Sequence, residues 1–105
     1  MIFGDNNNIW EGDMKYKCTN HCDVVLLKLN SGEIIPNHLH SNSEETALIL
    51  AGDGLISQNK RQKKVKKNDL VFLENNLSHN YIAGEKGMDL LVFHSPPMRD
   101  RQSIK

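Results

Sequence analysis

A group of histidines and glutamates in this chain has the spacing of a metal site. His38 and His40 lie two residues apart in a segment that reads as a β-strand, so both imidazoles point to the same face. The adjacent pair Glu44 and Glu45 begins the next expected strand and brings a carboxylate beside the histidines, and His79 opens a later strand. Three imidazole nitrogens and one carboxylate oxygen suit iron(II), manganese, nickel, copper, cobalt or zinc, but not magnesium or calcium. The spacing therefore predicts a site for one divalent transition metal.

The elements that must position these side chains are short strands, because apolar runs alternate with turn residues at the spacing of sandwiches and barrels. We expect strands at Lys15–Cys18, Val24–Leu29, Glu33–His40, Thr46–Ala51, Leu55–Ser57, Lys63–Val65, Leu70–Leu73, His79–Ile82 and Met88–His94. Turn residues separate them at Asn30–Gly32, Gly52–Gly54, Asn59–Lys60, Asn68–Asp69, Asn75–Asn76 and Gly84–Gly87. Without a helix of crossover length the strands must be mostly antiparallel. The prediction is an all-β chain folded as an antiparallel double-sheet jelly-roll barrel, which removes exposed sheet edges.

Length and charge set the organisation of the chain. Its 105 residues are enough for one domain, with a barrel core at about 15–94 and an arm at either end. Lys plus Arg and Asp plus Glu each number 13, so the formal net charge is zero. No global field attracts the chain to nucleic acid or to an anionic membrane, and we expect neither as a partner.

The N-terminal residues lack the basic start and apolar run of a signal peptide, and nothing approaches the ~20 apolar residues of a membrane helix. We therefore expect a cytoplasmic protein in which Cys18 and Cys22 are reduced thiols. No second cysteine pair is present to complete a zinc site with them.

The basic residues between Lys60 and Lys67 surround an expected hairpin. They could contact a phosphate-bearing ligand, but the absence of interleaved aromatic residues favours a solvated hairpin tip.

The same residues carry a resemblance to a known family, since the chain is similar to members of the cupin superfamily. The first motif of that family reads G-x5-H-x-H-x3or4-E-x6-G, and it is matched at every spacing by Gly32, His38, His40, Glu45 and Gly52. The gap of six residues before Gly52 favours Glu45 over Glu44. The resemblance thus implies a metal held by His38, His40, Glu45 and His79.

The second family motif, G-x5-P-x-G-x2-H-x3-N, is matched only in part. His79 is present, but the first glycine, the proline, the second glycine and the final asparagine are replaced by Asn68, Glu74, Asn76 and Ala83. Asparagine can adopt the left-handed turn conformation of glycine, so the replacements at 68 and 76 are tolerable. The resemblance covers roughly residues 24–93 and implies a jelly-roll barrel of six or more strands with the metal inside it.

Strand alternation predicts which side chains surround the metal. Ala47, Ile49 and Ala51 share the face of Glu45, while Thr46, Leu48 and Leu50 face the other way. By the same argument Tyr81 lies on the face of His79, and Ile34 and Pro36 lie on the face of His38. The expected substrate pocket is lined by Ile34, Pro36, Ala47, Ile49 and Tyr81.

Two functions remain open at this point. Four protein ligands leave up to two coordination positions for a chelating substrate if the metal is octahedral, which favours a metal-dependent enzyme, either a dioxygenase or an isomerase or lyase, acting on a small oxygenated compound. The alternative is a non-catalytic module that binds a small ligand or the metal, because the sequence shows no obvious acid or base. His94 and Glu44 are the candidates for that role, but each is more typical of a surface or strand end.

Apolar residues on both faces of Val24–Leu29 and Thr46–Leu50 leave an outer surface that needs a cover. A second copy of the chain can provide it through an isologous contact. We therefore expect a homodimer.

Overall fold

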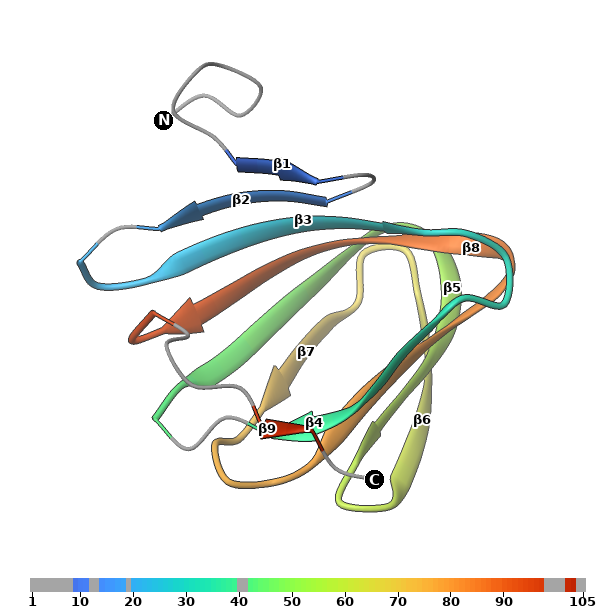
Figure 1. The fold of residues 1–105 in the computed structure, drawn as a ribbon. Coiled ribbons are helices and arrows are strands. Elements are labelled where there is room, and N and C mark those ends of the chain that lie inside the picture. The colour runs from blue at the N-terminus through green and yellow to red at the C-terminus, as the bar shows by residue number, and fades with distance from the viewer. Residues whose placement is uncertain (1–8, 12–13, 19, 40–41, 98–101, 104–105) are drawn as a thin grey trace.

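A computed structural model of the protein describes residues 9–11, 14–18, 20–39, 42–97 and 102–103 (Figure 1). These residues form nine strands and no helix: β1 (Ile9–Glu11), β2 (Met14–Cys18), β3 (Asp23–Leu29), β4 (Ile34–Leu39), β5 (Glu44–Gln58), β6 (Arg61–Lys66), β7 (Leu70–Leu73), β8 (His79–Ser95) and β9 (Gln102–Ser103). Every pairing is antiparallel. The expected all-β jelly-roll class is confirmed. No helix in this described part is long and apolar enough to span a membrane.

The two long strands β5 and β8 pair with each other and pass through both layers of the roll (Figure 1). In one layer the N-terminal part of β5 pairs with β7, and the C-terminal part of β8 pairs with β3, which leads on to β2 and β1. In the other layer the C-terminal part of β5 pairs with β6, and the N-terminal part of β8 pairs with β4 and then β9. The segments expected as arms thus add short strands, β1 and β9, to the sheet.

The turns expected at Gly52–Gly54 and Gly84–Gly87 are wrong, because both segments lie inside continuous strands, β5 and β8. The two strands bend together here, and their register shifts between Ile49 and Ala51 and again between Gly52 and Gly54. Gly52 and Gly87 have φ angles of 78° and 77°. A Cβ atom on Gly52 would lie 2.1 Å from the carbonyl oxygen of Gly87. Glycine is therefore needed for a sharp bend and a close backbone approach.

The asparagine turns behave as expected. Asn68 and Asn76, which replace the glycines of the second motif, have φ angles of 75° and 63°. The Asn59–Lys60 link between β5 and β6 has positive φ at both residues, 51° and 70°, as a two-residue hairpin turn requires.

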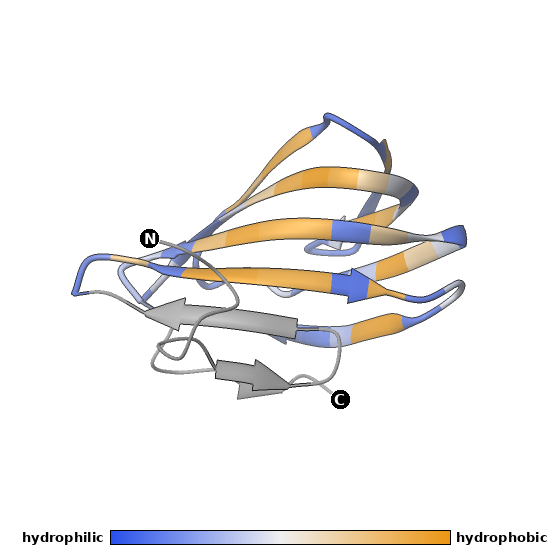
Figure 2. Cartoon of the chain, turned by 90° about the horizontal axis from the view of Figure 1, so that it is seen from above, coloured by the Kyte–Doolittle hydropathy of each residue, from blue (hydrophilic) through white to orange (hydrophobic). Residues whose placement is uncertain are grey.

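The core lies between the two layers, and hydrophobic residues run along the middle of the strands while hydrophilic residues gather near their ends (Figure 2). The buried apolar cluster comprises Val25, Leu29, Ala47, Ile49, Ile56, Val65, Leu73, Tyr81, Ala83, Met88, Leu90 and Val92. The sheet is not closed: among the described strands, β6 and β7 both pair with β5 but not with each other. This differs from the closed barrel that edge protection favoured, and it leaves an opening between β6 and β7.

Candidate metal centre

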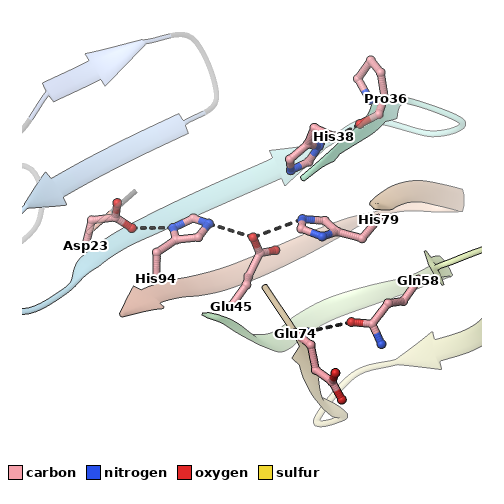
Figure 3. Close-up of polar contacts among 8 residues, drawn as sticks. All are labelled: Asp23, Pro36, His38, Glu45, Gln58, Glu74, His79 and His94. Atoms are coloured by element: carbon pink, nitrogen blue, oxygen red, sulfur yellow. Dashed lines mark hydrogen bonds and ion pairs between the residues drawn. The ribbon is translucent and has the colours of Figure 1, made fainter. Parts of the chain in front are cut away.

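Three buried side chains from three strands meet inside the roll (Figure 3). His38 of β4, Glu45 of β5 and His79 of β8 each offer one ligand atom, and these atoms lie within 4.8 Å of one another. At most 5 % of any of the three residues is exposed. His38 and His79 are cross-strand partners whose rings stand edge to face with centroids 4.3 Å apart. Nε2 of His79 lies 3.3 Å from Oε1 of Glu45.

The structure thus brings together three of the four side chains that the sequence assigns to the metal. The fourth, His40, lies outside the described residues. Glu44, which competed with Glu45, is exposed, as strand alternation from the buried Glu45 requires. Cys22 is half-buried and is not part of the cluster.

A backbone carbonyl of β4 determines which ring nitrogen of His38 carries the proton. Nδ1 of His38 lies 2.8 Å from the carbonyl oxygen of Pro36, and because a carbonyl only accepts, Nδ1 must donate. The lone pair of a neutral His38 is therefore on Nε2. A backbone carbonyl that fixes the tautomer in this way is typical of histidines that bind metals.

Besides His79, a further histidine, His94, contacts Glu45 and connects it to Asp23, an aspartate that the sequence analysis did not select. His94 Nδ1 forms a short hydrogen bond with Oδ1 of Asp23, and Nε2 of His94 lies 2.7 Å from Oε1 of Glu45 (Figure 3). Asp23 and Glu45 are the cross-strand partners of His94 on its two sides. Asp23 is completely buried and His94 is 4 % exposed. His94 is thus a buried link, not the strand-end surface residue that the sequence favoured.

The two carboxylates determine the charge of His94. Burial by itself lowers the pKa of this imidazole, but the hydrogen bonds to Asp23 and Glu45 and the negative charges of both outweigh that effect and raise the pKa to about 9. At neutral pH the imidazolium donates both N–H groups, one to each carboxylate. The chain Asp23–His94–Glu45 carries a net charge of −1, and it fixes Glu45 from the side of β3.

The donor set fits a divalent transition metal. Two imidazoles and one carboxylate of buried residues converge, and the carboxylate supplies the negative charge that a buried cation needs. A hydrogen-bonded partner behind a ligating carboxylate is the usual arrangement around bound metals. His38, Glu45 and His79 are the residues that would hold the ion.

The pocket expected around the metal is only partly present. Ala47 and Ile49 are fully buried on the face of Glu45. Ile34 is 55 % exposed and Pro36 is also exposed, so both were assigned to the wrong face. The register of β4 against β8 shifts between Ile35 and His38, which reverses the alternation there.

A register shift also explains Ala51. It was expected on the face of Glu45 but is exposed, because the pairing of β5 with β8 slips between Ile49 and Ala51. Sequence alternation cannot locate such a slip, since it requires knowledge of the partner strand.

Tyr81 lies in the interior next to the cluster. Its residue is 2 % exposed, and its ring centroid is 6.1 Å from that of His79. Among the described residues its hydroxyl has no hydrogen-bond partner. A buried phenol in this state is costly unless a ligand or water supplies the partner.

Comparison with known families supports the sequence motif. A family model described as "Cupin domain" matches residues 25–94. The chain belongs to the cupin family. A search of curated proteins found no match to this cupin.

Solved structures share the cupin fold of the chain at low identity. The nucleoside dehydratase Pac13 of Streptomyces is 14 % identical, with a TM-score of 0.77, and the match covers 93 % of this chain and 83 % of that one. KdgF from Halomonas sp. is 16 % identical, with a TM-score of 0.72 and coverage of 91 % and 88 %. A variant of the oxalate decarboxylase of Bacillus subtilis is 20 % identical, with a TM-score of 0.79, and the match covers 90 % of this chain but 28 % of that chain.

Proposed function

We propose that this cupin is a metal-dependent enzyme that acts on a small oxygenated compound able to chelate the metal. The observation that carries the proposal is the buried cluster of His38, Glu45 and His79, whose ligand atoms lie within 4.8 Å of one another. A divalent transition metal bound there would polarise substrate oxygens at its open coordination positions. His40 is proposed as the fourth ligand, on the strength of the first family motif.

The residues around the cluster have separate roles in this proposal. His94, itself held by Asp23, orients the carboxylate of Glu45 through a hydrogen bond to Oε1, the same oxygen that lies 3.3 Å from Nε2 of His79. Ala47 and Ile49 exclude water from the same face, which strengthens electrostatic interactions at the site. The hydroxyl of Tyr81 donates to an oxygen of the bound substrate.

Among the reactions that the sequence leaves open, we favour a lyase or isomerase over a dioxygenase. Two neighbours in fold are a nucleoside dehydratase and an oxalate decarboxylase, whose names describe the removal of a small molecule from an oxygen-rich substrate. A divalent metal held by the cluster would serve such a reaction as a Lewis acid that stabilises negative charge on a substrate oxygen, without a change of its own oxidation state.

The test begins with the metal content of the purified protein, measured by elemental analysis. Apo-protein is then loaded with each candidate metal and offered diols, hydroxy-acids and hydroxy-ketones, and products are followed by mass spectrometry. Glu45→Gln keeps the shape but removes the ligand charge, so it should lose metal and turnover while remaining folded. Glu44→Gln is the matched control and should keep both. A protein that binds no metal, or turnover that survives in Glu45→Gln, would contradict the proposal.

The second candidate is a non-catalytic cupin that binds a small ligand. It is favoured by one observation: in the described part of the chain, every buried histidine, aspartate and glutamate belongs either to the cluster or to the Asp23–His94–Glu45 chain. Tyr81 is then the one other buried side chain of this part that could donate a proton to a ligand. Tight binding of a chelator-type ligand with no change of any compound in the screen would support this alternative.

We also propose that the protein is a cytoplasmic homodimer. Exposed apolar side chains gather on the outer face of one layer, on β5, β7 and β8, and comprise Leu50, Leu70, Phe72 and Phe93. Thr46 pairs with Phe72 on one side and Phe93 on the other, so these side chains form one surface. Because the chain has no formal net charge, two copies can approach without repulsion. The second copy is the occupant that we propose for this surface.

A further inference from the structure

The opening between β6 and β7 forms a cleft of about 420 Å³. This volume lies within the range of small-molecule pockets. Its apolar lining includes the buried side chains Ile56, Val65 and Leu73, and its polar lining includes Gln58, Arg61 and Lys63. The cleft therefore combines an apolar inner wall with two exposed cations, and its lining extends to Leu70 and Phe72 of the apolar outer surface.

Strand register places the cleft beside the metal centre. His79 pairs with His38 on one side and with Gln58 on the other, and Gln58 pairs with Arg61. Cross-strand partners point to the same face of a sheet, so these four side chains form one row over β4, β8, β5 and β6. The row runs from the buried His38 and His79 through the half-buried Gln58 to the exposed Arg61. The Cα atom of Arg61 is two strand spacings, or about 10 Å, from that of His79. An arginine side chain can span much of that distance.

A second row runs parallel to the first. Tyr81 pairs with Ile35 and with Ile56, and Ile56 pairs with Lys63. Arg61 and Lys63 thus share the face of Val65, which is buried in the core. The other face of β6 carries Lys64 and Lys66, which line a different hollow. The basic hairpin is therefore divided: Arg61 and Lys63, both exposed, lie on the face of β6 that borders the cleft.

The two cations of the cleft have no acidic partner in the part of the chain that the structure describes. Within the described residues, neither Arg61 nor Lys63 forms an ion pair. Two acidic residues adjoin the lining in sequence. Asp69 precedes Leu70 and pairs with Lys66. Glu74 follows Leu73, and its carboxylate points away from Gln58 and from the histidines (Figure 3). Its backbone N–H donates to Oε1 of Gln58 over 2.7 Å, which holds the amide of Gln58 in the row. An anion entering the cleft would therefore meet positively charged hydrogen-bond donors, Arg61 and Lys63.

From these placements we propose that Arg61 and Lys63 bind an oxyanion group of the ligand, either a carboxylate or a phosphate, while its other oxygens reach the metal centre. The ligand class is then a small anionic oxygenated compound. Arginine and lysine are the side chains that recognise both groups, arginine with a planar pair of donors. The inference about the far end of the ligand rests on the proposed function, whereas the anion site itself does not require the metal.

The experiment compares three probes that share adjacent oxygens but differ in charge: glycerol, glycerate and glycerol 3-phosphate. Binding to the purified protein is measured by titration calorimetry, with and without added manganese. We expect glycerate or glycerol 3-phosphate to bind at least tenfold more tightly than glycerol, and the preferred probe identifies the anion. Arg61→Gln and Lys63→Gln should each lose most of this advantage. Lys64→Gln removes the same charge from the other face of the same strand and should keep it.

The outcomes separate this inference from the proposed function. The anion site would be overturned if the three probes bound equally or if none of them bound. It would also be overturned if Lys64→Gln lost as much of the anion advantage as Arg61→Gln. That result would show that the cations only protect the edge of β6 or act through overall charge. Metal content of Arg61→Gln should be unchanged. If the wild type binds no metal but the anion advantage still depends on Arg61 and Lys63, the metal proposal fails and the anion site stands.

Discussion

Nε2 of His94 lies 2.7 Å from Oε1 of Glu45, and the opposite nitrogen of the same ring is hydrogen-bonded to the buried Asp23. The contact joins β3, β8 and β5 through one imidazole, because Asp23 and Glu45 are the two cross-strand partners of His94. The candidate ligand Glu45 is thus held by the fold before any metal is present.

Asp23→Asn should weaken both the fold and the metal site. The change keeps the shape but removes the charge that stabilises the His94 imidazolium, so the free energy of unfolding should fall by roughly 1–3 kcal/mol. Because His94, which orients Glu45, loses the charged partner on its other nitrogen, metal affinity should fall by about 10- to 100-fold. Urea unfolding and metal titration measure the two effects, with Glu44→Gln as the exposed control. Unchanged metal affinity in Asp23→Asn would show that the chain serves stability alone.

The stability of the metal-free protein should depend on pH through His94. Its pKa is raised in the fold to about 9 from an unfolded value of 6.5, so the folded state binds more protons between these values. The stabilisation is fully present below pH 6.5 and is lost as the pH rises through 9, with a magnitude on the order of 1–3 kcal/mol. Urea unfolding in the presence of a chelator at pH 6 and pH 9.5 measures the difference. His94→Gln should show a smaller decrease over this range, and an equal decrease would assign the effect to other groups.

The three residues of the cluster could be predicted from the sequence, but the Asp23–His94 pair beside them could not. The difference is that the second prediction requires knowledge of strand register. Motif spacing and strand period are local properties, so His38, Glu45 and His79 could be selected from the sequence. The pairing of Asp23 with His94 depends on how two strands 71 positions apart align, which no local pattern records. The sequence does hold one signal, because Asp23 stands directly before the apolar run of β3. An aspartate at a strand end is usually interpreted as solvent-exposed, however, so the signal was not used.

The errors in the fold have a related cause. Gly52 and Gly87 were interpreted as turn residues because glycine breaks most strands, yet here both allow two paired strands to bend together. Because of these bends, β5 and β8 each run through both layers of the roll. Ile34 was misplaced because the bulge in β4 reverses the alternation of side chains there.

Tyr81→Phe should separate ligand binding from stability. The hydroxyl has no hydrogen-bond partner among the described residues, so removing it eliminates a buried unsatisfied group and should leave the melting temperature unchanged or slightly higher. If the hydroxyl donates to a bound substrate, affinity for the anionic probe should fall by about tenfold, which corresponds to a charge-assisted hydrogen bond. Thermal unfolding and titration of the same sample measure both. A large loss of stability would show instead that an ordered water satisfies this hydroxyl.

Phe72→Glu should convert the proposed dimer into a monomer. Phe72 is 58 % exposed on β7, and through Thr46 it adjoins Phe93 on the outer face of its layer. In an isologous contact the substitution enters the interface twice, so two carboxylates must be buried or brought together without partners, which costs several kcal/mol. Light scattering at micromolar concentration should give the dimer mass for the wild type and the monomer mass for the variant. Ile34→Glu is the matched control, because Ile34 is 55 % exposed but lies on β4 in the other layer, and this variant should remain dimeric. A monomeric wild type would rule out the dimer, and dissociation of both variants would place the interface elsewhere.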